Sequence, residues 1–196
     1  MSAALIMKRF AGTSPRIKAR MAGVFFILTM LTAAFTELVA RGKLSFAADV
    51  AAGLVEVSGM VVVTLLLYYI FEPESRGLSM LAASFNLVGL TCGAFRWNPR
   101  GVDITVVFAG VSCLLIGYLI FRSTFLPRIL GAPMVLAGLG WLTYVSSPFA
   151  NRLSPYNLAS GILGQGLVML WLLVMSVNVA CWQQQTGTHV EPRLVA

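Results

Sequence analysis

Long apolar runs separated by short polar segments dominate this sequence. The stretch from Cys113 to Gly131 shows the arrangement, because one apolar run ends at Arg122 and the next begins beyond Pro127. A helix crosses a bilayer core with about 20 consecutive apolar residues. Only 11% of the residues are charged, against roughly a quarter in ordinary soluble domains. The sequence therefore predicts an integral membrane protein.

The apolar runs predict an all-α, polytopic transmembrane bundle of six spans. Prolines fall mainly at the boundaries of the runs, where a missing N–H costs least, and the period-two alternation of a membrane barrel is absent. The predicted spans are residues 21–40, 50–71, 78–95, 104–121, 128–145 and 156–181. Together they form a transmembrane domain at 21–182, between a basic arm at 1–20 and a polar tail at 183–196.

Basic residues between the spans predict the orientation. With the N-terminus in the cytoplasm, nine Lys and Arg residues lie on that side and five on the other. Because cytoplasmic loops carry an excess of such residues, we expect both termini in the cytoplasm. The net charge of +7 is then explained without nucleic acid, since no basic patch with interleaved aromatic residues is present.

Two neighbouring segments carry a family resemblance. They are GYLIFRS, which ends at Ser123, and FLPRILG, which begins at Phe125. With SPRIKARMAGVFF, LLLYYIFEP and RGLSMLAASF, they make the chain resemble, over roughly residues 14 to 178, the bacterial membrane family called domain of unknown function 4386. The resemblance implies a multi-pass protein of the bacterial inner membrane, and it implies no particular activity.

The resemblance also implies two departures inside the spans. The family pattern often has an Arg in the third span, where this chain has Asn86. It often has a Glu in the sixth span, where this chain has Gln165. An intramembrane ion pair is thereby replaced by two amides, which puts in doubt any role that needs the charges.

Two carboxylates lie inside predicted spans, where a charge is costly and marks a candidate functional site. Glu37 precedes Arg41 by four residues, a spacing that puts both on one helix face, so we favour an interfacial ion pair. Glu56 lies about 9 Å below the outer surface at helical rise. It is interpreted as a buried packing carboxyl, with proton or cation handling as the alternative.

The two amides are interpreted mainly as contacts between helices. Asn86 shares a helix face with Gly89 and Gly93, and Gln165 shares one with Gly161. Small residues let a second backbone approach, and amides on such faces stabilise helix pairs. With the predicted orientation, a polar layer forms toward the outer side, made of Glu37, Glu56, Asn86, Arg96 and Gln165. It is either a packing layer, which we favour, or the lining of a cavity.

The segment between the fourth and fifth spans offers Arg122 and Arg128 as candidate contacts to lipid head groups. Orientation and a rigid turn are the simpler interpretation of both. Metal and cofactor sites are not expected, because the three cysteines match no metal spacing and the single histidine, His189, lies in the tail. A catalytic triad inside the membrane is excluded for the same reason.

Three functional hypotheses remain. The leading one is a non-enzymatic accessory, sensory or binding protein, whose partner is a lipid, another membrane protein or a second copy. The second is a small proton-coupled transporter or channel that uses Glu56 and the polar layer. The third is an intramembrane enzyme acting on lipid, with Glu37 or Glu56 as a base.

Overall fold

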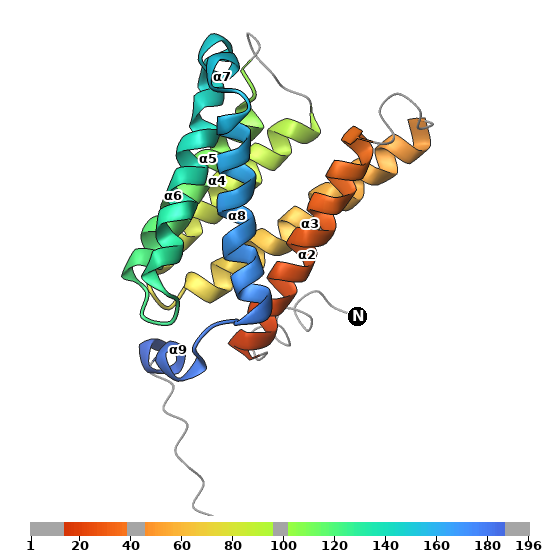
Figure 1. Cartoon of the computed structure of the whole chain (residues 1–196). Coiled ribbons are helices and arrows are strands. Elements are labelled where there is room, and N and C mark those ends of the chain that lie inside the picture. Colours follow the sequence, from red (N-terminus) through yellow and green to blue (C-terminus); the bar gives the residue numbers. More distant parts are fainter. Residues whose placement is uncertain (1–13, 39–45, 96–101, 187–196) are drawn as a thin grey trace, which may run out of the picture.

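The computed structural model describes residues 14–38, 46–95 and 102–186, and over these residues it is helical without strands. Figure 1 shows the long helices side by side, with α2 and α3 on one side of the molecule and α4, α5, α6 and α8 on the other. The elements are α2 (Pro15–Leu38), α3 (Phe46–Phe71), α4 (Arg76–Ala94), α5 (Ile104–Arg122), η2 (Arg128–Leu130), α6 (Gly131–Leu142), η3 (Thr143–Val145), α7 (Ser147–Leu153), α8 (Tyr156–Val174) and α9 (Val179–Thr186).

Six stretches of helix are long and apolar enough to cross a membrane, as predicted. The second, Val50–Phe71, ends at the predicted residue, and the fourth and fifth, Ile104–Arg122 and Arg128–Val145, differ from the predicted bounds by one residue at most. The first begins at Pro15, six residues before the predicted start. Arg16, Lys18 and Arg20 therefore lie on the first turns of α2.

The predicted end of the sixth span at residue 181 is wrong. Helix α8 ends at Val174, and Cys181 lies on the separate helix α9. Ser176 interrupts the chain between them with a φ of 62°, in the left-handed region that L-residues rarely adopt. The apolar pattern alone did not reveal this break, because Val177 and Val179 continue it in sequence.

Helix pairs follow the chain for the most part, and α8 closes the bundle. α2 packs on α3, α4 on α5, and α5 on α6, while α8 packs against both α6 and α2. The N-terminal end of α2 and helix α9 lie at the same end of the molecule, here called the α9 end, and α7 lies at the opposite end (Figure 1).

Glycines allow the closest helix contacts. A Cβ built on Gly89 would lie 3.0 Å from the Thr105 carbonyl oxygen, so the predicted close approach at Gly89 is present between α4 and α5. Gly110 and Gly138 face each other in the same way between α5 and α6, where a Cβ on Gly138 would lie 2.8 Å from the Gly110 oxygen. Such approaches replace hydrophobic burial as the source of helix association in lipid.

The buried core lies toward the α9 end. Ile70 and Phe71 at the end of α3 and Leu119 and Ile120 at the end of α5 are each at most 1% exposed. In the other half of α2 and α3, Leu31 and Leu54 are 64% and 66% exposed. The same halves lean away from the remaining helices in Figure 1. The α9 end is thus the tightly packed part of the bundle.

Candidate functional site

Asn86 connects two helices in the interior. Its Nδ2 donates to Thr64 Oγ1 at 2.7 Å, and the Thr64 hydroxyl donates in turn to the Met60 carbonyl oxygen at 2.7 Å. Thr64 is 3% exposed and Asn86 is partly buried, so this bond between α4 and α3 is partly shielded from water. The geometry is that of an amide holding two helices together.

Gln165 makes a second connection of the same kind. Its Nε2 donates to Cys113 Sγ at 2.9 Å, which joins α8 to α5. Cys113 is 2% exposed, and its thiol is a weak acceptor in an otherwise apolar contact. The amides of Asn86 and Gln165 therefore each bind a neighbouring helix.

Both amides, each partly buried, also line one cavity between the helices. This larger cavity has a volume of about 20 Å³, and Ser112 also lines it. A smaller cavity of about 10 Å³ is also lined by Asn86 and Ser112, together with Thr64 and Ser79. The structure thus brings Asn86 and Gln165, far apart in sequence, to one interior region.

The rest of the predicted polar layer is only partly described. Glu56 is partly buried on α3 and has an interaction partner. Glu56 precedes Thr64, the partner of Asn86, by eight residues on α3. It therefore lies more than two helical turns, about 12 Å along the axis, from the Asn86 contact. The side chain of Glu37 and all of Arg96 lie outside the described residues.

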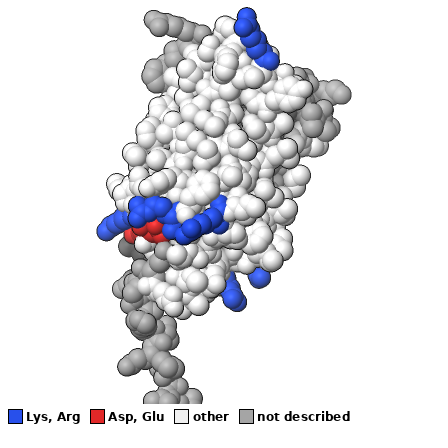
Figure 2. Space-filling model, turned by 60° about the vertical axis from the view of Figure 1, so that its left-hand side comes forward, with Lys and Arg blue, Asp and Glu red and all other residues white. Residues whose placement is uncertain are grey.

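At the α9 end, cationic side chains gather around two carboxylates of the α3–α4 turn (Figure 2). Arg122 Nε lies 3.2 Å from Glu74 Oε1, and the Glu74 side chain is only 7% exposed. Arg122 is 53% exposed, so the pair is half in solvent. Arg122 is therefore engaged in joining α5 to this turn, whereas Arg128 is exposed at the start of η2.

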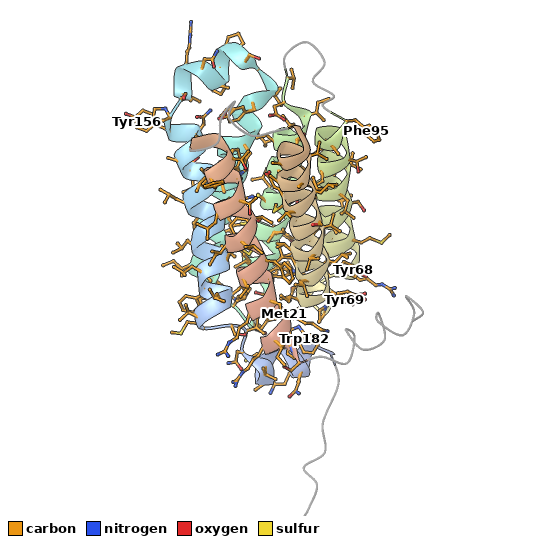
Figure 3. All side chains as sticks on the ribbon, turned by 90° about the vertical axis from the view of Figure 1, so that its right-hand side faces the viewer. Met21, Tyr68, Tyr69, Phe95, Tyr156 and Trp182 are labelled. Carbon is orange, nitrogen blue, oxygen red and sulfur yellow. The ribbon has the colours of Figure 1, made fainter. Side chains whose placement is uncertain are left out.

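A second group of polar contacts at this end ties α2 and α4 to α3. Lys18 Nζ lies 5.4 Å from the centroid of the Tyr69 ring, within the range of a cation–π contact. Tyr68 donates to Glu72 Oε1 at 3.3 Å, and Arg76 Nε lies 3.7 Å from the same oxygen. In Figure 3, Tyr68 and Tyr69 lie at the same end of the molecule as Trp182.

A large groove opens at the α9 end, where α8 breaks. It has a volume of about 530 Å³, within the usual range of small-molecule sites. Its polar lining comes from Arg16, Thr124, Ser176 and Asn178, and its apolar lining includes Trp171. The other lining residues are Phe125, Leu126, Pro127, Met175 and Val177.

Three segments far apart in sequence hold the shape of this groove. The Ser176 hydroxyl donates to the Arg16 carbonyl oxygen at 3.2 Å, which fixes the break after α8 against the start of α2. The Asn178 N–H donates to the Phe125 carbonyl oxygen at 3.1 Å, which fixes the same break against the α5–α6 segment. The groove is therefore a built feature of the fold, with Arg16 in its lining and the buried Phe125 and Leu126 as an apolar floor.

Sequence reasoning did not select most residues of the groove. Arg16 was counted only as a basic residue of the arm, because its helix was expected to begin later. Ser176 and Asn178 were placed inside the sixth span. The polar sequence Ser176-Val177-Asn178 directly before Cys181 was the available signal for a break.

The comparisons with known proteins agree with the predicted resemblance. The family described as domain of unknown function (DUF4386) matches residues 92–176. The chain thus resembles this family across α5, α6 and α8. An uncharacterized protein of Archaeoglobus fulgidus is 28% identical over 125 residues, covering 58% of this chain and 75% of that protein. No solved structure matches the chain. The family match includes Gln165 and most of the groove lining.

Metal chemistry finds no support in the described residues. Across residues 14–38, 46–95 and 102–186, no group of three or more His, Cys, Asp or Glu side chains could hold a metal ion. The cysteines described there, Cys92, Cys113 and Cys181, are free thiols. Two structural features therefore remain as candidate sites: the polar interior around Asn86 and the groove at the α9 end.

Proposed function

We propose that the protein is a non-enzymatic, multi-pass component of the bacterial inner membrane that binds an anionic phospholipid at the α9 end. It acts there as an accessory or sensory protein. The observation that carries the proposal is the groove of about 530 Å³ at the break after α8, with Arg16 and Trp171 in its lining.

The charge distribution supports a cytoplasmic position for the α9 end. Among the described residues, the Lys and Arg side chains of α2, α4, α5 and η2 lie at this end: Arg16, Lys18, Arg20, Arg76, Arg122 and Arg128. Arg152 lies on α7 at the opposite end. Over the whole sequence the predicted topology gives nine basic residues on this side and five on the other. Such an excess follows the positive-inside rule, and the cytoplasmic leaflet is also the one that carries anionic lipid.

The chemistry of the groove fits a phospholipid. Arg16 supplies a guanidinium, the group best suited to bind a phosphate through parallel N–H donors. Thr124 and Asn178 add hydroxyl and amide donors, and the buried Phe125 and Leu126 provide an apolar floor. Trp171 belongs to the residue type enriched where head groups meet acyl chains. The phosphate head group would therefore contact the polar residues, and the proximal acyl chain would contact the apolar floor beside them.

The interior offers little support for the transporter alternative. The two cavities beside Asn86, about 10 and 20 Å³, have room for roughly one water molecule each. The bonds from Asn86 to Thr64 and from Gln165 to Cys113 both join neighbouring helices. A packing role for these amides is the interpretation that the volumes favour.

Native mass spectrometry tests the proposal. The delipidated full-length protein is mixed with phosphatidylglycerol or with phosphatidylcholine of the same acyl chains, and lipid-bound species are quantified. We expect phosphatidylglycerol to bind in preference. Arg16→Gln should weaken its binding about fivefold, because one interfacial charge contributes about 1 kcal/mol.

Arg152→Gln is the matched control, since it removes the same charge at the α7 end. It should leave phosphatidylglycerol binding unchanged. Equal binding of the two lipids, or an equal loss in both variants, would overturn the proposal. Displacement of bound lipid by millimolar inorganic phosphate would show that the site recognises phosphate alone and would reject the lipid assignment.

A further inference from the structure

We propose that the two cavities beside Asn86 each bind one water molecule, and that these waters join polar side chains of α3, α4, α5 and α8 into one hydrogen-bonded network. The inference rests on the unsatisfied hydroxyl of Ser79, on the polar lining of the cavities and on their size, and it is independent of the lipid site. It assigns to the interior a ligand, water, that neither amide contact by itself requires.

Ser79 gives the first reason. Its side chain is 2% exposed, and its hydroxyl finds no hydrogen-bond partner in the described part of the chain. A buried hydroxyl left unsatisfied costs about 1–3 kcal/mol, and in a membrane no bulk water can relieve that cost. Ser79 lines the smaller cavity with Thr64, Asn86 and Ser112. A water there has several polar neighbours, as buried waters require.

The larger cavity gives the second reason. Its volume of about 20 Å³ exceeds the roughly 10–15 Å³ needed for one water. Asn86 Nδ2 and Gln165 Nε2 each donate one bond, to Thr64 and Cys113, which leaves the second N–H and the carbonyl oxygen of each amide for other partners. Each amide carbonyl oxygen therefore remains to accept a bond from a water, and the Ser112 hydroxyl in the same lining can donate to one or accept from it.

Asn86 and Ser112 connect the two waters, because both residues line both cavities. The path runs from Ser79 through one water to Asn86 and Ser112, and through the second water to Gln165. It joins α4, α5 and α8, and Thr64 adds α3. The network thereby satisfies polar groups that an apolar interior would leave exposed to hydrocarbon.

Methionines placed around the larger cavity make the proposal measurable. Met60, Met134 and Met169 line it, and Met134 and Met169 are each 2% exposed. X-ray irradiation of the protein in nanodiscs and H₂¹⁸O produces hydroxyl radicals from bound water, which oxidise the nearest sulfur and leave ¹⁸O-labelled sulfoxide. Met30, partly buried on α2, and Met80, 61% exposed on the lipid side of α4, are internal controls.

We expect several-fold more ¹⁸O label at Met134 and Met169 than at Met30 and Met80. Label at Met134 and Met169 no higher than at the controls would show that the larger cavity is dry and would overturn the proposal. This arm uses only the unmodified protein, so it does not depend on the folding of a variant.

Ser112→Val tests the network, since it removes the hydroxyl shared by the cavities. It should lower the label at Met134 several-fold and leave Met30 unchanged. Ser84→Val is the matched control, because Ser84 is exposed on α4 and bonds only within its own helix, to Met80. Undiminished label at Met134 in folded Ser112→Val, or an equal loss in Ser84→Val, would reject the network.

Discussion

Two glycines of α8, two residues apart, allow the helix contacts of this protein to be tested with a single chemical change. A Cβ on Gly164 would clash with the Pro133 carbonyl oxygen and lie 2.8 Å from the Ala137 Cβ, both on α6. A Cβ on Gly166 would meet nothing within 4 Å. Gly164→Ala and Gly166→Ala therefore add the same methyl group to the same helix, and only one of them forces α6 and α8 apart.

The expected magnitudes follow from two opposing effects. Replacing Gly by Ala in a helix interior stabilises it by about 1 kcal/mol, and this gain applies at both positions. Overpacking a tight contact costs about 1–3 kcal/mol. The atoms met at Gly164 belong to backbone and to an Ala, which cannot rotate away, so we take the upper value. Gly164→Ala should thus lose about 2 kcal/mol and Gly166→Ala gain about 1 kcal/mol.

Thermal unfolding in detergent, followed by fluorescence-detected size exclusion, measures the difference. For a chain of this length, 1 kcal/mol shifts Tm by about 2–4 °C. We expect Gly164→Ala to unfold about 4–8 °C below the wild type and Gly166→Ala about 2–4 °C above it. All three proteins are heated at one rate, because apparent Tm values of irreversible unfolding depend on it. Equal Tm values for the two variants would refute the contact between α6 and α8.

Two further predictions concern polar contacts. Asn86→Ala should destabilise the bundle in SDS-induced unfolding by about 0.6–1.7 kcal/mol, which spans the average and the largest value for hydrogen bonds between membrane helices. Ser84→Ala, which removes a bond within α4 only, should have almost no effect. Equal losses in the two variants would contradict the role of Asn86. Trp182→Phe removes the bond from Nε1 to the Ile70 carbonyl oxygen, 3.1 Å long, and should speed amide exchange of α9 about fivefold, for a loss of about 1 kcal/mol. Unchanged exchange in Trp182→Phe would show that this bond does not hold α9 in place.

Much of the fold could be predicted because membrane spans obey a local rule. Each run must be apolar for about 20 residues and must satisfy its own backbone as a helix. The prolines at 73 and 127 and the charges beside them therefore marked the ends of spans correctly. The close approach at Gly89 was predictable for the same local reason, since small residues on one helix face indicate a contact before the partner is known.

The candidate site was less predictable because its parts come from different helices. The amides at 86 and 165 could be recognised as polar residues inside spans, but their partners, Thr64 and Cys113, could not be inferred from spacing. Arg122 was a candidate contact to lipid head groups, with orientation and a rigid turn as the simpler interpretation, and its ion pair with Glu74, 3.2 Å from Nε to Oε1, was not predicted. That pair depends on how the α3–α4 turn packs beside the end of α5, which no local pattern encodes.

Sequence alone determined that this is a multi-pass helical membrane protein, and it located four of the six spans, the second to the fifth, to within two residues, because the bilayer imposes length and polarity on each segment separately. Tertiary structure alone decided where α8 ends. The left-handed residue Ser176 is held by bonds from the break to Arg16 and Phe125, which lie on distant parts of the chain. The groove, the buried hydroxyl of Ser79 and the shared cavities likewise exist only because separate helices meet, so they follow from packing and not from any one segment.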